Sequence, residues 1–323
     1  MSEFYSGKSV VVTGGSGMIG SQLVEELVLA GAEVYVADDF SRGHIRVPGA
    51  IYIEPSDTSD YEYCAWLFAG GTKAKPMFAV FNLAAKVAGV VHNQKNHLGM
   101  FTSNVMLQTA PIMAAEHAGV EHFLQVSSAC VYAEEYQSPC REPYGLVGEP
   151  HLANYGYAWS KRMGEKMAYA SNLRHVVVVR PSNVYGPHDY FDSLAHLIPK
   201  LILKCLDDSS TITMFSPPDT IREFVYSRDV AKGMMAALEY GQHKTAYNIG
   251  CNGDNQITIT DLLSLIQRVM GTDKTVIWGS DTSLSSGDRA RWSDCSLASQ
   301  ELNWQYTTTL EDGLAAVVDW YGR

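Results

Sequence analysis

The chain has 323 residues and a net charge of −11, from 24 Lys and Arg against 35 Asp and Glu, and 46% of its residues are hydrophobic. This acidic, globular composition argues against binding to nucleic acid or anionic lipid, and no apolar run approaches the roughly 18 residues of a membrane-spanning helix. The six cysteines and ten histidines are scattered without ligand spacing, so we expect a reduced cytoplasmic protein with no metal site.

The first half of the chain alternates strands and helices. The N-terminus enters a strand at once, without the layout of a signal peptide. We expect strands at 9–15, 33–40, 50–55, 77–85, 122–128 and 175–187, and helices at 21–31, 104–119 and 154–171. Apolar strands joined by helices are typical of an α/β fold whose parallel sheet is covered on both faces.

The regular alternation ends after Pro187. We expect helices near Leu197–Leu206 and Asp261–Met270, a strand at 247–250 and a last helix at the C-terminal end. These shorter elements predict a smaller lobe that is built from interleaved segments.

A glycine-rich turn joins the first strand to the first helix. Gly14, Gly17 and Gly20 lie in "VVTGGSGMIGSQ". Glycine there permits a tight turn and lets backbone N–H groups approach a pyrophosphate at the helix N-terminus. Since the strand–turn–helix context is present, we predict a dinucleotide site.

Acidic residues follow the second and third strands. The second strand ends in Asp38 and Asp39, where a carboxylate binds the adenosine ribose hydroxyls and repels a 2′-phosphate. This favours NAD over NADP, although Arg42 lies close enough to leave NADP possible. Asp57 is the candidate for the adenine amino group.

Tyr157 and Lys161 lie one helical turn apart and so share a helix face. An ammonium beside a phenol lowers the phenol pKa, so we expect Tyr157 to take a hydroxyl proton while hydride leaves the same carbon. Lys161 can also hold the nicotinamide ribose, and Ser128 can hydrogen-bond the same alcohol or carbonyl oxygen. Each residue alone could be structural, but the three in this order behind the glycine turn predict an oxidoreductase site.

Seven motifs appear in the order of a known family: "TGGSGMIG", "NLAAKVAGV", "SSACVY", "YGYAWSK", "RPSNVYGPHD", "REFVYSRDVA" and "LEDGL". Nearly the whole chain thus resembles the extended short-chain dehydrogenase/reductase family of nucleotide-sugar epimerases and dehydratases. The resemblance implies a Rossmann-type doubly wound domain over 1–182, with returning segments near 220–250, and a smaller mixed α/β substrate lobe over 183–323. It also implies a homodimer and a nucleotide-diphosphate sugar bound between the lobes.

Two residues point to a branch of that family. The Asp-Glu pair of the 4,6-dehydratases is replaced by Ala129 and Cys130, and a cysteine there resembles the GDP-L-fucose synthase and GDP-mannose 3,5-epimerase branch. In that branch the cysteine and a histidine invert carbons beside a C4 ketone, which implies acid/base roles for Cys130 and His196. A buried core thiol remains the alternative for Cys130, and His188 competes with His196.

The resemblance implies further contacts. The cofactor set adds Met18, Ile19, Thr58, Leu83, Ala84, Ala85, Lys86 and Asn104. The substrate set is Lys86, Ser128, Cys130, Asn183, His196, Lys204, Arg222, Arg289 and Arg291. Guanidinium groups suit pyrophosphate oxygens, although each Arg alone could be a solvated charge.

Three functions therefore compete. The first is C3/C5 epimerisation of a nucleotide sugar, with a GDP-sugar implied by resemblance alone, through a 4-keto intermediate and possibly with C4 reduction. The second is a 4-epimerase or 4-ketoreductase that uses only Ser128, Tyr157 and Lys161. The third is a cofactor-sensing regulator, which the intact Tyr157 and Lys161 pair disfavours.

Overall fold

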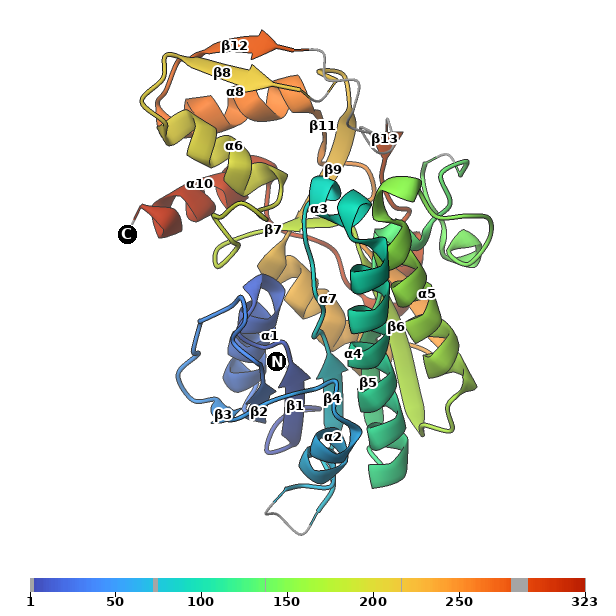
Figure 1. Ribbon diagram of the computed structural model, residues 1–323. Coiled ribbons are helices and arrows are strands. Elements are labelled where there is room, and N and C mark those ends of the chain that lie inside the picture. Colours follow the sequence, from blue (N-terminus) through green and yellow to red (C-terminus); the bar gives the residue numbers. More distant parts are fainter. Residues whose placement is uncertain (1–2, 72–74, 137, 216, 280–289, 323) are drawn as a thin grey trace.

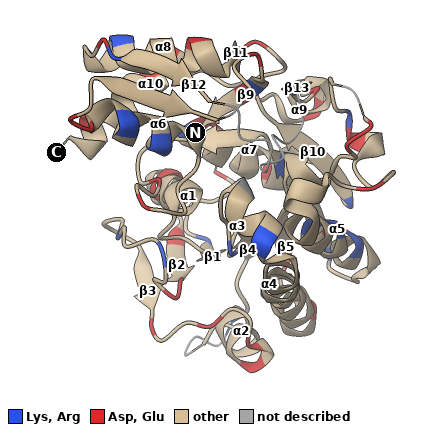
Figure 2. Cartoon of the chain, turned by 45° about the horizontal axis from the view of Figure 1, so that its top comes forward, with Lys and Arg blue, Asp and Glu red and all other residues tan. Residues whose placement is uncertain are grey.

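The computed structural model describes residues 3–71, 75–136, 138–215, 217–279 and 290–322. A larger lobe built around a parallel sheet lies below a smaller lobe in Figure 1. None of the helices within these residues combines the length and apolar character that a bilayer crossing requires. Basic and acidic residues are interspersed over both lobes (Figure 2).

Seven strands form the sheet of the larger lobe, in the order β10-β6-β5-β4-β1-β2-β3. Their bounds are β1 Ser9–Thr13, β2 Glu33–Ala37, β3 Ile51–Ile53, β4 Ala79–Asn82, β5 His122–Val126, β6 His175–Pro181 and β10 Thr245–Ile249. All neighbouring pairs run parallel. The predicted doubly wound α/β class is confirmed.

Helices cover both faces of this sheet. On one face lie α1 (Met18–Leu29) and α7 (Ser227–Tyr240), and on the other lie α2 (Tyr61–Phe68), α4 (His97–Ala118) and α5 (Tyr155–Ala170). Successive residues of β1 alternate between the two cores, with Val10 and Val12 in one and Val11 in the other. Burial on both faces explains why the strands read as continuous apolar runs.

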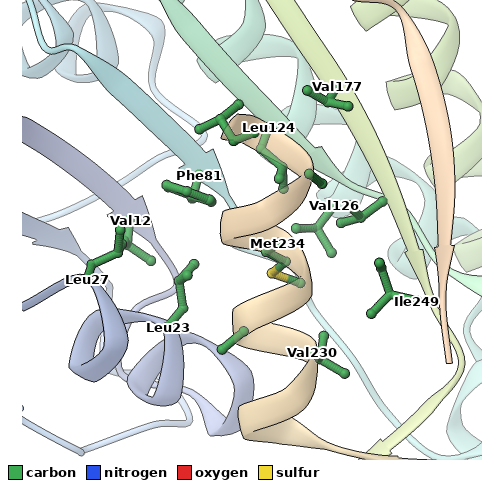
Figure 3. Packing of buried hydrophobic residues seen from close by; sticks show 14 of the residues in the cluster. Val12, Leu23, Leu27, Phe81, Leu124, Val126, Val177, Val230, Met234 and Ile249 are labelled. Atoms are coloured by element: carbon green, nitrogen blue, oxygen red, sulfur yellow. The ribbon is translucent and has the colours of Figure 1, made fainter. Parts of the chain in front are cut away.

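The core under α7 shows how a late segment completes the early sheet. Figure 3 shows Val230 and Met234 of α7 beside Leu23 of α1 and the strand residues Phe81 and Leu124. All five side chains are fully buried. A Met234→Ala change in such a core would cost about 2–5 kcal/mol of unfolding free energy.

The smaller lobe has its own core of residues from two small sheets and three helices. The four-stranded sheet contains β7 (Asn183–Tyr185), β9 (Ile221–Tyr226), β11 (Gln256–Thr258) and β13 (Ala290–Arg291), and the second pairs β8 (Thr211–Met214) with β12 (Thr275–Trp278). The helices are α6 (Leu197–Leu206), α8 (Ile259–Met270) and α10 (Leu310–Tyr321). Two further helices are α3 (Val90–Lys95) and α9 (Ser296–Leu302).

Several boundaries differ from the sequence predictions. The expected strand 175–187 is two strands in different sheets, because after Pro181 the chain leaves β6 and β7 pairs with β9. The helix expected at 104–119 begins earlier, at His97. Five strands and four helices were not predicted, namely β8, β9, β11, β12, β13, α2, α3, α7 and α9. The proposed domain limits at 182/183 stay a prediction, with α7 and β10 returning to the first sheet and β9 lying in the second.

The order of the strands locates the ligand crevice. β1 has β2 on one side and β4 on the other, so the connections leave in opposite directions at this point. In open parallel sheets, ligands bind outside the carboxyl ends of the strands at such a switch point. The glycine turn after β1 lies there.

Candidate active site

The glycine turn is packed so closely that side chains are excluded. Gly14 has φ +69° and donates its N–H to the Ala37 carbonyl oxygen at 2.9 Å. A Cβ built on Gly14 would lie 3.0 Å from backbone atoms of Ala84, and one on Gly20 would lie 2.1 Å from the Gly14 oxygen. Both positions therefore require glycine: Gly14 lets the turn pack against the loop after β4, and Gly20 lets α1 pack against the turn.

The N-terminus of α1 suits a pyrophosphate. Gly17 is the N-cap, no side chain caps the first turn, and that turn carries no acidic residue. The hydroxyl oxygen of Ser16 is buried without a hydrogen-bond partner among the described residues. Free N–H groups and an unpaired hydroxyl are what an anionic phosphate would satisfy. Met18 and Ile19, both predicted contacts, form the first turn of this helix.

Asp38 lies beside this turn as predicted. Its carboxylate accepts hydrogen bonds of 2.9 Å from the backbone N–H of Ser16 and of Phe40. Burial raises its pKa, and the two hydrogen bonds counteract the rise. A pocket lined by Asp38, Asp39, Phe40, Glu54, Pro55 and Ser56 adjoins it. The loop thus fits an adenosine whose ribose reaches Asp38, so the glycine turn, α1 and this pocket together fit NAD.

Arg42 is occupied by protein groups. Its guanidinium lies over the Tyr190 ring at 4.1 Å from the centroid, and it pairs with Asp192 at 3.4 Å. A 2′-phosphate would have to compete for it with both groups. Asp57, the predicted adenine contact, accepts hydrogen bonds from Ser59 and is exposed, so its role stays a prediction.

Buried polar groups fix the loop after β4. The Thr13 hydroxyl accepts hydrogen bonds of 3.1 Å from the N–H groups of Leu83 and Ala84. Fully buried Asn104 of α4 accepts from the Lys86 N–H at 2.9 Å and donates to the Lys86 oxygen at 3.0 Å. The segment 83–86, which includes Ala85, is thereby held against the glycine turn, while the Lys86 side chain is exposed.

Ser128, Tyr157 and Lys161 come together at the end of β5. Tyr157 and Ser128 share a hydrogen bond, and the Lys161 ammonium lies 5.7 Å from the Tyr157 ring centroid. Lys161 is 2% exposed and donates to the Val126 oxygen at 2.8 Å. Burial lowers the Lys161 pKa to about 8.

The expected lowering of the Tyr157 pKa is not seen. Burial raises it, and the adjacent Cys130 raises it further, while the hydrogen bond with Ser128 lowers it. In the protein alone, the cost of burying a phenolate is the largest influence on this pKa. Tyr157 therefore stays protonated. It needs additional positive charge in the site before its phenolate, the form that accepts a proton, is populated.

Cys130 lies within this group. It is half-buried in a short 3₁₀ turn, η1 (Ala129–Val131), whose N-cap Ser128 accepts its N–H at 3.2 Å. The Asn154 amide approaches its sulfur at 3.8 Å. Cys130 is partly exposed, and it lies close enough to Tyr157 and Lys161 to raise the pKa of both. A sealed core position is therefore excluded.

The two candidate histidines have different partners. His196, the N-cap of α6, is 36% exposed in its side chain, and its Nδ1 lies 3.2 Å from Oδ1 of Asp189. His188 hydrogen-bonds Ser21 of α1 at 2.8 Å through Nδ1, packs on Trp320, and has its pKa lowered by burial. His188 thus joins elements of the fold, whereas His196 is partly exposed, and its role as a proton donor stays a prediction.

Arg291, on β13 of the smaller lobe, contacts the candidate catalytic turn, by which we mean Ser128 and η1. It donates to the carbonyl oxygens of Ala129 and Tyr132, at 3.2 Å and 3.3 Å. The guanidinium therefore lies over the turn that carries Cys130, from 162 residues away in the chain. Arg289 lies outside the described residues.

The described contacts of the remaining predicted substrate residues lie away from Ser128, Cys130 and Tyr157. The Asn183 amide donates to the backbone carbonyl oxygen of Glu223 at 2.8 Å. Half-buried Arg222 donates to the carbonyl oxygen of the preceding residue, Ile221. Lys204, near the end of α6, is engaged with the Thr213 oxygen of β8 at 2.8 Å. No described contact links Lys204 to the catalytic turn.

Lys200 was missed in the sequence. It lies one turn after His196 on α6, and a Cβ built on Gly89 would lie 3.3 Å from its Nζ. Within the described residues its side chain has no ionic partner. The four-residue spacing from His196 could have identified it, but the family resemblance directed attention to Lys204.

Comparison with known proteins gives a consistent set. A model of the NAD dependent epimerase/dehydratase family matches residues 10–250. A GDP-L-fucose synthase of Sinorhizobium fredii is 30% identical over 320 residues, 96% of this chain and 94% of that protein. The Escherichia coli GDP-L-fucose synthase is 28% identical over 259 residues, 75% of this chain and 79% of that protein.

Solved structures of nucleotide-sugar enzymes share the fold of this chain. A UDP-glucose 4-epimerase of Thermotoga maritima with UDP-glucose superimposes with a TM-score of 0.86 at 25% identity, covering 97% of this chain and 98% of that one. A dTDP-glucose 4,6-dehydratase of Streptomyces venezuelae with NAD bound gives a TM-score of 0.82 at 26% identity, covering 97% of each chain.

Proposed function

Because the chain belongs to the NAD-dependent epimerase/dehydratase family, we propose that it epimerises a nucleotide sugar at C3, C5 or both carbons through a transient 4-keto intermediate. Cys130 carries this proposal: its accessible thiol lies beside Tyr157 and Lys161, and the turn that holds it begins at Ser128. The curated relatives named GDP-L-fucose synthase support a GDP-linked hexose as substrate.

The first task of the site is proton transfer at the C4 oxygen. Tyr157 takes the hydroxyl proton while Ser128 hydrogen-bonds the same oxygen, and Lys161 holds positive charge behind them. When bound, oxidised NAD supplies the hydride acceptor at C4 and a positive charge that favours the Tyr157 phenolate. The glycine turn and Asp38 are the residues that would hold it.

The second task is inversion beside the ketone. A C4 ketone acidifies the C–H bonds at C3 and C5, so a Cys130 thiolate can take one proton while the bonding electrons move onto the C4 oxygen. Ser128 and Tyr157 hold that oxygen. His196 returns a proton to the carbon from the opposite face, the electrons flow back to re-form the ketone, and the carbon is inverted. The carbon thus loses one proton and gains one.

The cofactor loop bears on the net reaction. Asp38 disfavours a 2′-phosphate and Arg42 is held by Tyr190 and Asp192, which supports a retained NAD and a redox-neutral cycle. With reduced cofactor supplied, the same Tyr157 and Lys161 would reduce a 4-keto sugar at C4.

Three cations are the candidates for binding the substrate diphosphate. Arg291 lies over the catalytic turn, Arg222 lies on β9, and Lys200 lies next to His196 on α6. Together they would offset the two negative charges that an acidic protein otherwise repels.

Two neighbouring helices offer a surface for a second copy of the chain. α4 and α5 lie side by side (Figure 1). Among their exposed apolar side chains are Leu98, Met106 and Met113 of α4 and Tyr155 and Met163 of α5. Contiguous apolar side chains on a helix pair are typical of an isologous dimer, so we expect a homodimer. A Met106→Lys and Met163→Glu double variant should sediment as a monomer, and an unchanged dimer would refute this face.

All six cysteines are free thiols, which suits a reducing compartment, and we therefore place the protein in the cytoplasm. Fractionation of cells into cytosolic and periplasmic or organellar extracts, with detection by antibody, would test this. Recovery outside the cytosolic fraction would contradict it.

The function is tested with GDP-linked hexoses and their 4-keto derivatives in D2O. Deuterium should appear at C3 or C5, in step with formation of the inverted sugar. If C4 alone inverts, with no exchange at C3 or C5, the protein is a 4-epimerase that uses only Ser128, Tyr157 and Lys161. UDP-linked and dTDP-linked hexoses in parallel reactions identify the base.

A further inference from the structure

Asp189 lies under His196 in the irregular segment between β7 and α6. It is 4% exposed, and its Oδ1 lies 3.2 Å from Nδ1 of His196. The same oxygen accepts the Tyr190 backbone N–H at 2.8 Å. Its second oxygen, Oδ2, is buried without a hydrogen-bond partner among the described residues. His196 is therefore the side-chain partner of this buried carboxylate.

Burial of a carboxylate with so few partners is costly. Removing an acceptor from water without a compensating hydrogen bond costs free energy, and the cost is larger for a charged group. An apolar residue would fill the same place without that cost. The only hydrogen bond that this carboxylate shares with a side chain among the described residues is with the His196 imidazole, so its role is sought in that contact.

The segment around Asp189 is anchored on two sides. Arg42 stacks on Tyr190 from the cofactor loop, and Phe191 stacks on Tyr321 of α10, with ring centroids 3.9 Å apart. The carboxylate is therefore fixed in place, while the imidazole that it contacts is partly exposed. A fixed acceptor holding a partly exposed ring determines how that ring is oriented.

We propose that Asp189 is the positioning residue that makes His196 a proton donor through Nε2. Asp189 accepts the proton on Nδ1, so Nε2 is the nitrogen left to face the substrate. When Nε2 gives its proton to the carbon being inverted, the ring keeps the Nδ1 proton and becomes a neutral imidazole. No ring flip is then needed between deprotonation and reprotonation. This inference rests on the proposed epimerisation.

The kinetic test uses Asp189→Asn, which preserves the size of the side chain. The new amide can donate to Nδ1, which favours the neutral ring that carries its proton on Nε2. That ring has no Nδ1 proton to keep, so giving up the Nε2 proton would leave an unfavourable imidazolate. Completed inversion should fall about 10²–10⁴-fold in kcat, with little change in KM. Deuterium exchange by Cys130 at the first face should remain. Asp207→Asn, the same change at the exposed far end of α6, is the matched control and should invert at the wild-type rate.

A second measurement needs no variant at position 189. In protein with ¹⁵N-labelled histidine, the His196 signals are identified by their loss in His196→Gln. The neutral ring should carry its proton on Nδ1. A neutral ring protonated on Nε2, or wild-type inversion by a folded Asp189→Asn, would overturn the proposal. A wild-type protein that exchanges no deuterium at C3 or C5 would instead refute the epimerase function, so the two failures are distinguishable.

Discussion

The Lys161 ammonium donates a hydrogen bond of 2.8 Å to the Val126 carbonyl oxygen, two residues before Ser128. This bond fastens α5 to the carboxyl end of β5. Because Tyr157 lies one turn earlier on the same helix, its hydroxyl reaches Ser128 and the turn that carries Cys130. In the proposed mechanism, this one buried contact therefore aligns the groups that act at the C4 oxygen with the thiol that acts at the neighbouring carbons.

That contact predicts an alkaline limit to activity. Burial lowers the Lys161 pKa to about 8, and the site needs the protonated ammonium. C4 oxidation should therefore fall as pH rises through about 8, because the fraction of charged Lys161 falls. In Lys161→Arg the guanidinium stays charged, so the residual activity should lack this limb. An identical alkaline limb in both proteins would assign it to another group.

The cofactor loop predicts a preference for NAD. A 2′-phosphate would face the Asp38 carboxylate, and Arg42 is occupied by Tyr190 and Asp192. Calorimetry should show NAD binding at least about tenfold more tightly than NADP, a difference of about 1.4 kcal/mol. Asp38→Asn removes the negative charge and should reduce the difference in affinity between NAD and NADP. Tighter binding of NADP to the wild-type protein would contradict this account of the loop.

Two lysines on α6 allow a controlled test of substrate binding, with Lys200 as the predicted contact and Lys204 as the control. Lys200 lies near Gly89 and one turn from His196, whereas Lys204 is bound to the Thr213 oxygen. Lys200→Gln should raise KM for the nucleotide sugar by about 10-fold or more, since a charge-assisted contact contributes about 1.5–3 kcal/mol. Lys204→Gln should change KM by less than about twofold. A larger rise in KM for Lys204→Gln than for Lys200→Gln would instead support Lys204, the residue that the family resemblance indicated.

Acid stability should depend on His122, at the start of β5. Its Nδ1 is buried without a partner among the described residues, and burial, with the adjacent His175, lowers its pKa from 6.5 to about 4. The folded protein thus disfavours the charged ring, so the free energy of unfolding should decrease as pH falls from about 6.5 to 4. In His122→Asn the decrease should be smaller, as measured by urea unfolding at several pH values. Parallel curves for the two proteins would exclude this residue as the cause.

The sequence was most informative where physical requirements are local. Gly14 and Gly20 could be predicted because one turn imposes them, and Tyr157 and Lys161 because helical spacing joins them. The strands of the first sheet were recognisable because burial on both faces makes them continuously apolar.

Other features depend on contacts between distant or irregular segments. Asp189 reaches His196 across a loop with no repeating period, and Arg291 meets Ala129 from 162 residues away. The apolar run 175–187 conceals a change of sheet after Pro181. Lys204 was chosen by resemblance, whereas the orientation of α6 places Lys200 toward Gly89.

Solvent-deuterium exchange by two single-atom variants tests the central claim most directly. With a supplied GDP-4-keto-hexose in D2O, Cys130→Ser should lower deuterium incorporation at C3 and C5 by about 10²–10⁴-fold, because a hydroxyl is a far poorer base than a thiolate. With NADH added as the hydride donor, reduction of the ketone at C4 should survive in this variant. Tyr157→Phe should show the opposite pattern, with exchange retained and C4 reduction lost. If Cys130→Ser exchanges deuterium at the wild-type rate, the thiol takes no part in epimerisation and the account is wrong.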